Sequence, residues 1–113
     1  MARTPAFARA FAGRWRIVEM DVWDNDFLDL VEPAHLTFEG ETGGEIAFGA
    51  LKGLLDVRYG ARDGAACAEF SWEGYDNDPA CGRGWVTIGT AGRLVGHFFL
   101  HQGDDSGFVC EPM

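Results

Sequence analysis

The stretch "LLDVRYGARDGAACAEFSWEG", residues 54–74, contains two runs rich in apolar and aromatic residues, separated by a short turn signal. Runs of this composition are typical of β-strands. The sequence Arg-Asp-Gly at 62–64 is a short glycine-containing link of the kind that joins antiparallel neighbours. In the second run Phe70 and Trp72 alternate with polar residues, so we expect one face to be buried and the other to face solvent.

The same pattern recurs along the rest of the chain. Short glycine-containing links at 42–44, 52–53 and 90–92 separate further strand-like runs, and no link is long enough for a parallel crossover. With the hairpin above, eight strands are predicted, at residues 14–23, 35–40, 45–51, 54–61, 66–74, 84–90, 93–101 and 107–111.

The predicted fold class is all-β, a small antiparallel up-and-down barrel of about eight strands, because closure removes the edges that an open sheet exposes. A chain of 113 residues fits a single domain, 1–113. Thr4 followed by Pro5 reads as the start of a helix. We therefore expect a short N-terminal helix or arm at 1–12, followed by the barrel at 13–113.

The cysteines and the N-terminus indicate a cytoplasmic protein. The chain has three cysteines, an odd number without CxxC spacing, and its first residues contain too short an apolar run for a secretory signal. No stretch is apolar over the length that a membrane-spanning helix needs. We expect reduced thiols and no membrane partner.

The charges are segregated along the chain, whose net charge is −9. Residues 1–16 contain four arginines and no acid, whereas residues 17–51 contain nine acidic residues and no Lys or Arg. An acidic surface repels nucleic acid and favours a basic protein, a polyamine or a metal ion as partner. Alternatively, these acidic residues serve only to keep the protein soluble.

Two similar strings, "WDNDF" at 23–27 and "YDNDP" at 75–79, raise the question of a cation site. Asp24, Asp26 and Asp29 lie within six residues, as in a calcium loop, but the glycine and the distant Glu of an EF-hand are missing. Asp and Asn also hydrogen-bond their own backbone in turns. We predict a structural turn at 24–29, an irregular loop at 75–84, and no metal or other cofactor.

The sequence "GRWRI" at residues 13–17 follows the predicted helix and begins the first strand. It resembles the Gly-x-Trp signature of the calycin superfamily, which includes the lipocalins, the fatty-acid-binding proteins and the avidin-like barrels. The resemblance implies that Trp15, in Gly13-Arg14-Trp15, closes one end of the barrel. It also implies that a late arginine covers this tryptophan, and Arg93 is the arginine that comes late enough.

The aromatic content suggests a function, because small-molecule pockets use aromatic walls, although aromatics also fill the core of a small barrel. The candidate ligand-binding residues are Trp72, Trp85, Tyr59, Phe48 and Phe98. Three hypotheses follow. The first is a non-catalytic barrel that binds a small apolar or aromatic molecule. The second is an acidic protein that binds a basic protein partner, as an interaction protein or an inhibitor does. The third is an enzyme that acts on a small molecule at a site in the barrel mouth.

Overall fold

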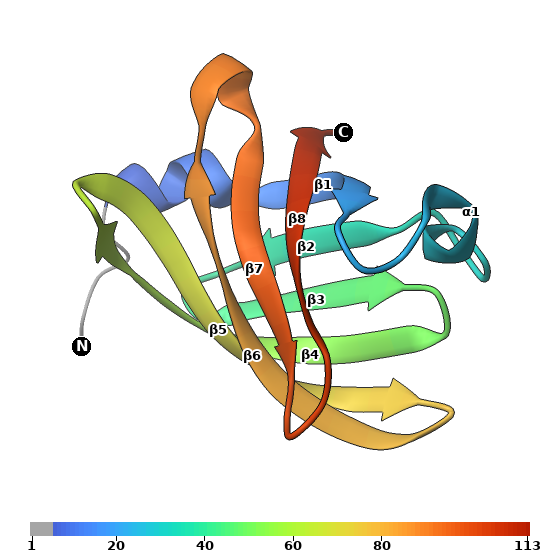
Figure 1. Ribbon diagram of the computed structural model, residues 1–113. Coiled ribbons are helices and arrows are strands. Elements are labelled where there is room, and N and C mark those ends of the chain that lie inside the picture. The colour runs from blue at the N-terminus through green and yellow to red at the C-terminus, as the bar shows by residue number, and fades with distance from the viewer. Residues whose placement is uncertain (1–5) are drawn as a thin grey trace.

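The computed structural model describes residues 6–113, except for the side chains of residues 6, 7 and 90. It is a closed antiparallel barrel in which each strand pairs with its neighbours in sequence and the last pairs with the first (Figure 1). The strands are β1 (Gly13–Met20), β2 (His35–Glu39), β3 (Gly43–Phe48), β4 (Leu51–Arg62), β5 (Ala65–Asp76), β6 (Asp78–Ile88), β7 (Leu94–Leu100) and β8 (Asp105–Pro112).

The predicted fold class is confirmed, and every predicted strand overlaps one of the eight observed strands. The predicted N-terminal helix corresponds to a 3-10 helix, η1 (Ala6–Phe11), while Thr4 and Pro5 lie outside the described residues. Two further short helices are α1 (Asn25–Leu28) and η2 (Thr90–Gly92). No helix within residues 6–113 is long and apolar enough to cross a membrane.

The prediction of an irregular loop at 75–84 is wrong, because β5 and β6 extend through this segment and are joined by a tight turn at Asn77. Asn77 has a φ of 67°, a left-handed conformation that Asn tolerates better than most residues. Pro79 opposes Tyr75 in β5, and β6 gains its second partner, β7, only from Gly82 onward. Pro79, which has no backbone N–H, is therefore accommodated in the part of β6 that pairs with a strand on one side only.

The predicted link at 52–53 is also wrong, since both residues lie inside β4. The chain turns instead at Gly49, where φ is 58°. A Cβ atom at this position would lie 2.4 Å from the ring of Phe27. Glycine is required here both for the backbone conformation and for the close packing of the loop that carries α1.

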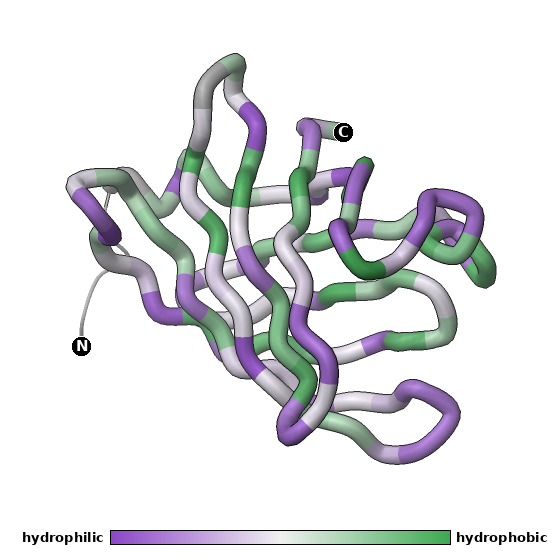
Figure 2. Tube along the Cα trace, viewed as in Figure 1, coloured by the Kyte–Doolittle hydropathy of each residue, from purple (hydrophilic) through white to green (hydrophobic). Residues whose placement is uncertain are grey.

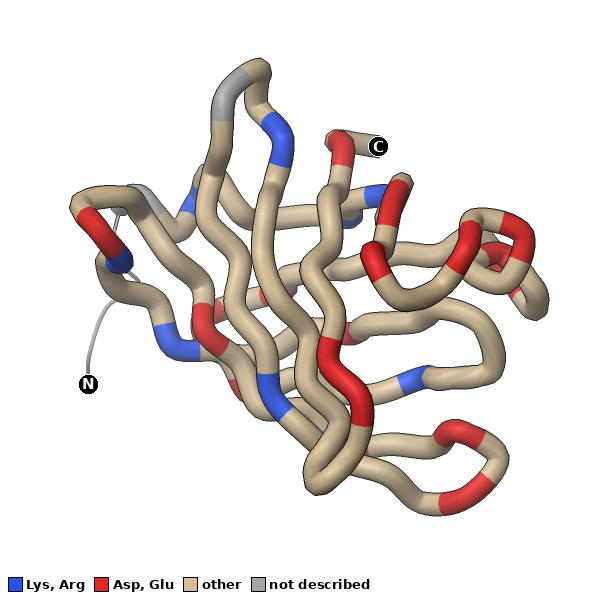
Figure 3. Tube along the Cα trace, in the orientation of Figure 1, with Lys and Arg blue, Asp and Glu red and all other residues tan. Residues whose placement is uncertain are grey.

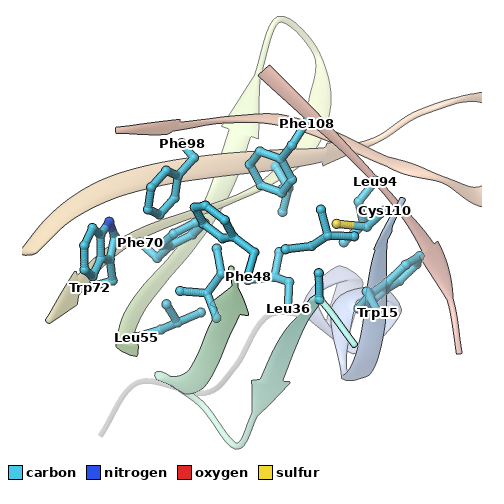
Figure 4. Packing of buried hydrophobic residues seen from close by; sticks show 14 of the residues in the cluster. Trp15, Leu36, Phe48, Leu55, Phe70, Trp72, Leu94, Phe98, Phe108 and Cys110 are labelled. Carbon is cyan, nitrogen blue, oxygen red and sulfur yellow. The ribbon is translucent and has the colours of Figure 1, made fainter. Parts of the chain in front are cut away.

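The barrel interior is filled by side chains from all sides (Figure 4). Hydrophobic and polar residues mix along each strand (Figure 2), and the inward set forms one continuous core. The indole of Trp72 lies against Gly53 of β4 and Gly82 of β6, where a Cβ atom would come within 2.8 and 2.7 Å of it. Its Nε1 donates a hydrogen bond to the carbonyl oxygen of Phe99 in β7 (3.1 Å).

One barrel end is closed by η1. Trp15 is buried and its Nε1 donates to the carbonyl oxygen of Phe11 (2.9 Å), which ties η1 to β1. Phe11 is fully buried against Phe38. The predicted cover of Trp15 by Arg93 is wrong, because the Arg93 guanidinium forms an ion pair with Glu111 (2.6 Å) on the outside of the barrel.

The opposite end is partly covered by the loop that contains α1. The Asp24 side chain caps α1 by accepting a hydrogen bond from the backbone N–H of Phe27 (3.0 Å). The Asp29 carboxylate accepts from the N–H of Ala34 (2.8 Å) and binds Arg16 (2.8 Å). These two carboxylates make the backbone contacts that a structural turn requires.

Replacing Trp15 by alanine should lower the free energy of unfolding by about 3–5 kcal/mol, because a closed barrel collapses poorly around the resulting cavity. The midpoint of denaturant unfolding measures the loss. Trp23→Ala is the matched control, since Trp23 is only half-buried and should cost less. Equal midpoints for Trp15→Ala and the parent protein would contradict the role of Trp15 in closing the barrel.

Candidate functional site

The five candidate ligand-binding residues do not lie around one pocket. Phe98 stacks on Trp72 (5.2 Å between ring centroids) and packs edge-on against Phe48 (5.1 Å), and all three are buried inside the barrel. Tyr59 lies toward the other end, against Phe11 of η1. Trp85 points outward from β6. Ligand binding by these residues therefore stays a prediction, and in the structure three of them fill the core.

The outer face of β4, β5, β6 and β7 is ordered in rows by the strand register. Buried and exposed positions alternate along β4 and β5, so every second residue points outward. The first row consists of Arg58, Glu69, Trp85 and His97, and the second of Asp56, Ser71, Arg83 and Phe99. The third row consists of Leu54, Glu73 and Cys81, and the fourth of Lys52, Tyr75 and Pro79.

Two hollows lie side by side on this outer face. The first, here called the arginine hollow, has a volume of about 470 Å³ and is lined by residues of the first two rows together with Arg62. The second, here called the apolar hollow, has a volume of about 1040 Å³, and its lining includes the third and fourth rows, Glu45 and the core residue Trp72. Asp56 and Ser71 line both hollows, which makes them continuous.

The arginine hollow combines cations with aromatic rings. The guanidinium of Arg62 lies over the ring of Trp85 at 4.0 Å, and that of Arg83 lies over Phe99 at 5.3 Å. Arg58 forms an ion pair with Asp56. Three guanidinium groups face two carboxylates in the lining, a local excess of one positive charge on a protein of net charge −9.

This arrangement suits a flat, negatively charged molecule. Guanidinium groups bind carboxylate, sulfonate or phosphate oxygens through paired N–H donors, and they stack on planar rings. The rings of Trp85 and Phe99, which are partly exposed beside these guanidinium groups, offer further stacking area. Because the arginines are exposed, an entering molecule meets their donors without opening the barrel.

Sequence reasoning missed this cluster because its members come from different strands. Only Trp85 was among the candidate residues, and Arg58, Arg62 and Arg83 are not adjacent in the sequence. The tight turn after Arg62 places Arg58 opposite Glu69, and the second hairpin places Trp85 opposite Glu69. Pairing the outward residues across these two turns is the signal that could have revealed the cluster.

The apolar hollow has large exposed side chains. Leu54 and Tyr75 are 69% and 64% exposed, respectively, and lie in adjacent rows. Glu73 lies between Leu54 and Cys81, and it forms no ion pair with any residue between 6 and 113. The basic side chain in the lining of this hollow is Lys52, whose Nζ lies 3.8 Å from Oε1 of Glu45.

A buried histidine lies beside the apolar hollow. His35 is 1% exposed, and its Nε2 contacts carboxylate oxygens of Glu32 (3.2 Å) and Glu45 (3.5 Å) and the Arg14 guanidinium (3.3 Å). These contacts join the loop after α1 to three strands. In the described part of the chain no three His, Cys, Asp or Glu side chains are placed to hold a metal ion.

The cluster predicts an acid sensitivity of the fold. The hydrogen bond with His35, assisted by the nearby Lys52, lowers the pKa of Glu32 below its usual value of 4.5. A lowered folded-state pKa means that the carboxylate stabilises the protein above its unfolded pKa and that this contribution is lost as pH falls through the folded pKa. Glu32→Gln should therefore lose less stability than the parent protein when the pH is lowered from about 5 to about 3.

Urea unfolding at a series of pH values measures this difference. Glu39→Gln, a change of the same kind at an exposed position of β2, is the control and should follow the parent protein. Parallel stability curves for Glu32→Gln and the parent protein would contradict the contribution of the Glu32 contacts.

Comparison of the chain with protein-family models, curated proteins and solved structures gives no match.

Proposed function

We propose that the protein is a non-catalytic barrel that binds a small planar anion on the outer face of β4–β7, in the arginine hollow. The observation that carries this proposal is the convergence of Arg58, Arg62 and Arg83 with the rings of Trp85 and Phe99. The sequence favours a small apolar or aromatic ligand. The filled interior supports moving the site of that ligand from the inside of the barrel to the outside.

The recognition would use two kinds of contact. The planar part of the ligand would stack beside Trp85 and Phe99, and its acidic group would accept hydrogen bonds from the arginines. A hydrogen bond with a charged partner contributes about 1.5–3 kcal/mol, so removing one arginine should weaken binding about tenfold or more. Arg58 and Asp56 form an ion pair at the boundary with the apolar hollow.

Two broader proposals accompany the function. Kinship with the calycin barrels is supported by the Gly13-x-Trp15 pattern at the start of β1 and by the short helix that closes this end.

A reducing, cytoplasmic location is supported by the three free thiols. Burial raises the pKa of Cys67 and Cys110, so both thiols are held in the neutral form inside the fold.

A second candidate function is the binding of a basic protein at the end of the barrel that α1 partly covers. Acidic residues gather at this end in the loop after β1 and at the β5–β6 and β7–β8 turns (Figure 3). The antiparallel order places these three connections at the same end of the barrel, although they are far apart in sequence. Asp24 and Asp26 are exposed there, as a docking surface for a basic partner requires.

Binding of the fluorescent planar anion Nα-dansylglycine tests the first function. Its affinity for the parent protein should fall about tenfold or more in Arg83→Gln and in Trp85→Ala. Arg93→Gln, which removes an arginine on another part of the surface, is the control and should bind as the parent does. Equal affinity for the parent protein and Arg83→Gln, or an equal loss in Arg93→Gln, would refute the site.

Binding of a decalysine peptide at low and high salt tests the second function. The double variant Asp24→Asn, Asp26→Asn should bind the peptide more weakly at low salt, because Asn keeps the α1 cap but removes both charges. The control is Glu39→Gln with Glu41→Gln, which removes two exposed charges at the opposite end of the barrel. Equal losses in both double variants would indicate non-specific attraction.

A further inference from the structure

The arginine hollow and the apolar hollow form one trough along the outward rows of β4–β6. Successive rows are two residues apart on each strand, which corresponds to about 7 Å. The row of Trp85 and the row of Tyr75 are three steps apart, so the trough extends for about 20 Å. A ligand that fills the arginine hollow alone would leave the larger part of the trough empty.

The charge changes sign along this trough. The arginine hollow has a local excess of positive charge, as described above. In the apolar hollow the one basic side chain is Lys52, and it is engaged by Glu32 (3.5 Å) and Glu45 (3.8 Å). Glu73, in contrast, has no basic partner within residues 6–113, and Leu54 is its neighbour in the same row.

These surroundings favour a cation beside Glu73. The Glu73 carboxylate is exposed and has no basic partner among the described residues, so an ammonium group can pair with it without breaking an existing ion pair. The ring of Tyr75 in the next row offers a second attraction for a cation through its face. Leu54, which is 69% exposed, offers contact to the methylene groups that would precede the ammonium group.

We propose that the ligand of this trough is dipolar: besides its planar anionic part it carries an amine on a short aliphatic arm, which lies over Leu54 and binds Glu73. This inference rests on the proposed function, because it assumes that the arginine hollow holds the anionic part. The Glu73 row lies one step from the Arg83 row and two from the Trp85 row. The amine is therefore about 7 Å from the acidic group and about 13 Å from the stacked ring.

Three probes that share one planar part test the proposal. Nα-dansylglycine has the ring and the carboxylate, Nα-dansylnorleucine adds an aliphatic arm, and Nα-dansyllysine adds the same arm with a terminal ammonium group. We expect the lysine probe to bind the parent protein about fivefold more tightly than the norleucine probe at low ionic strength. Added salt should reduce this preference because Glu73 is exposed.

Variants locate the preference on the trough. Glu73→Gln keeps the size of the side chain and should bind the lysine and norleucine probes equally, while Glu39→Gln, on the opposite side of the barrel, should keep the parent preference. Reaction with iodoacetamide gives a second readout, because Cys81 lies next to Glu73 and is the exposed one of the three thiols. The lysine probe should slow this reaction more than the glycine probe does.

The outcomes separate the two proposals. If the glycine probe binds with the expected dependence on Arg83 but the lysine probe shows no advantage over norleucine, the arginine site stands and the dipolar ligand is refuted. A preference for lysine that persists in Glu73→Gln refutes it as well. If the glycine probe does not bind to the parent protein, both proposals fail.

Discussion

The packing of Trp72 inside the barrel is the constraint on which the other features depend. Its indole extends from β5 across Gly82 of β6 to a carbonyl oxygen of β7, and its other side lies against Gly53 of β4. Four strands are thereby held at one spacing and in one register by a single side chain. A shift of one residue would bring polar outward residues into the core, so the register is strongly specified.

The side chains that fill the core and the residues that line the two hollows come from the same strands. Phe98 contacts both Phe48 and Trp72 inside the barrel, and the arginine hollow and the apolar hollow carry the outward residues of the same strands. The outward positions of the same strands carry the arginines, Glu73 and Tyr75. Under the proposed function, stability and recognition would use opposite faces of one sheet, so substitutions on the outer face should change binding without opening a cavity in the core.

The two surface charge patterns have separate origins. The acidic barrel end is made by turns and by the loop after β1, where Asp and Asn also serve as turn residues. The arginine hollow is made within regular strands, where the register places cations from β4 and β6 around Glu69 of β5. A molecule of net charge −9 can thus present a cationic site, because charges in direct contact with a ligand influence it more strongly than distant charges that salt screens.

The sequence by itself determined the number of strands, their antiparallel order and the closure into a barrel, because alternation and short links are local signals. It also determined the turn role of Asp24. The tertiary structure decided that the 75–84 segment is a hairpin, that Arg93 binds Glu111 and not Trp15, and that Arg58, Arg83 and Trp85 share one face. These features depend on register between strands and on packing around Trp72, which no local pattern of residues specifies.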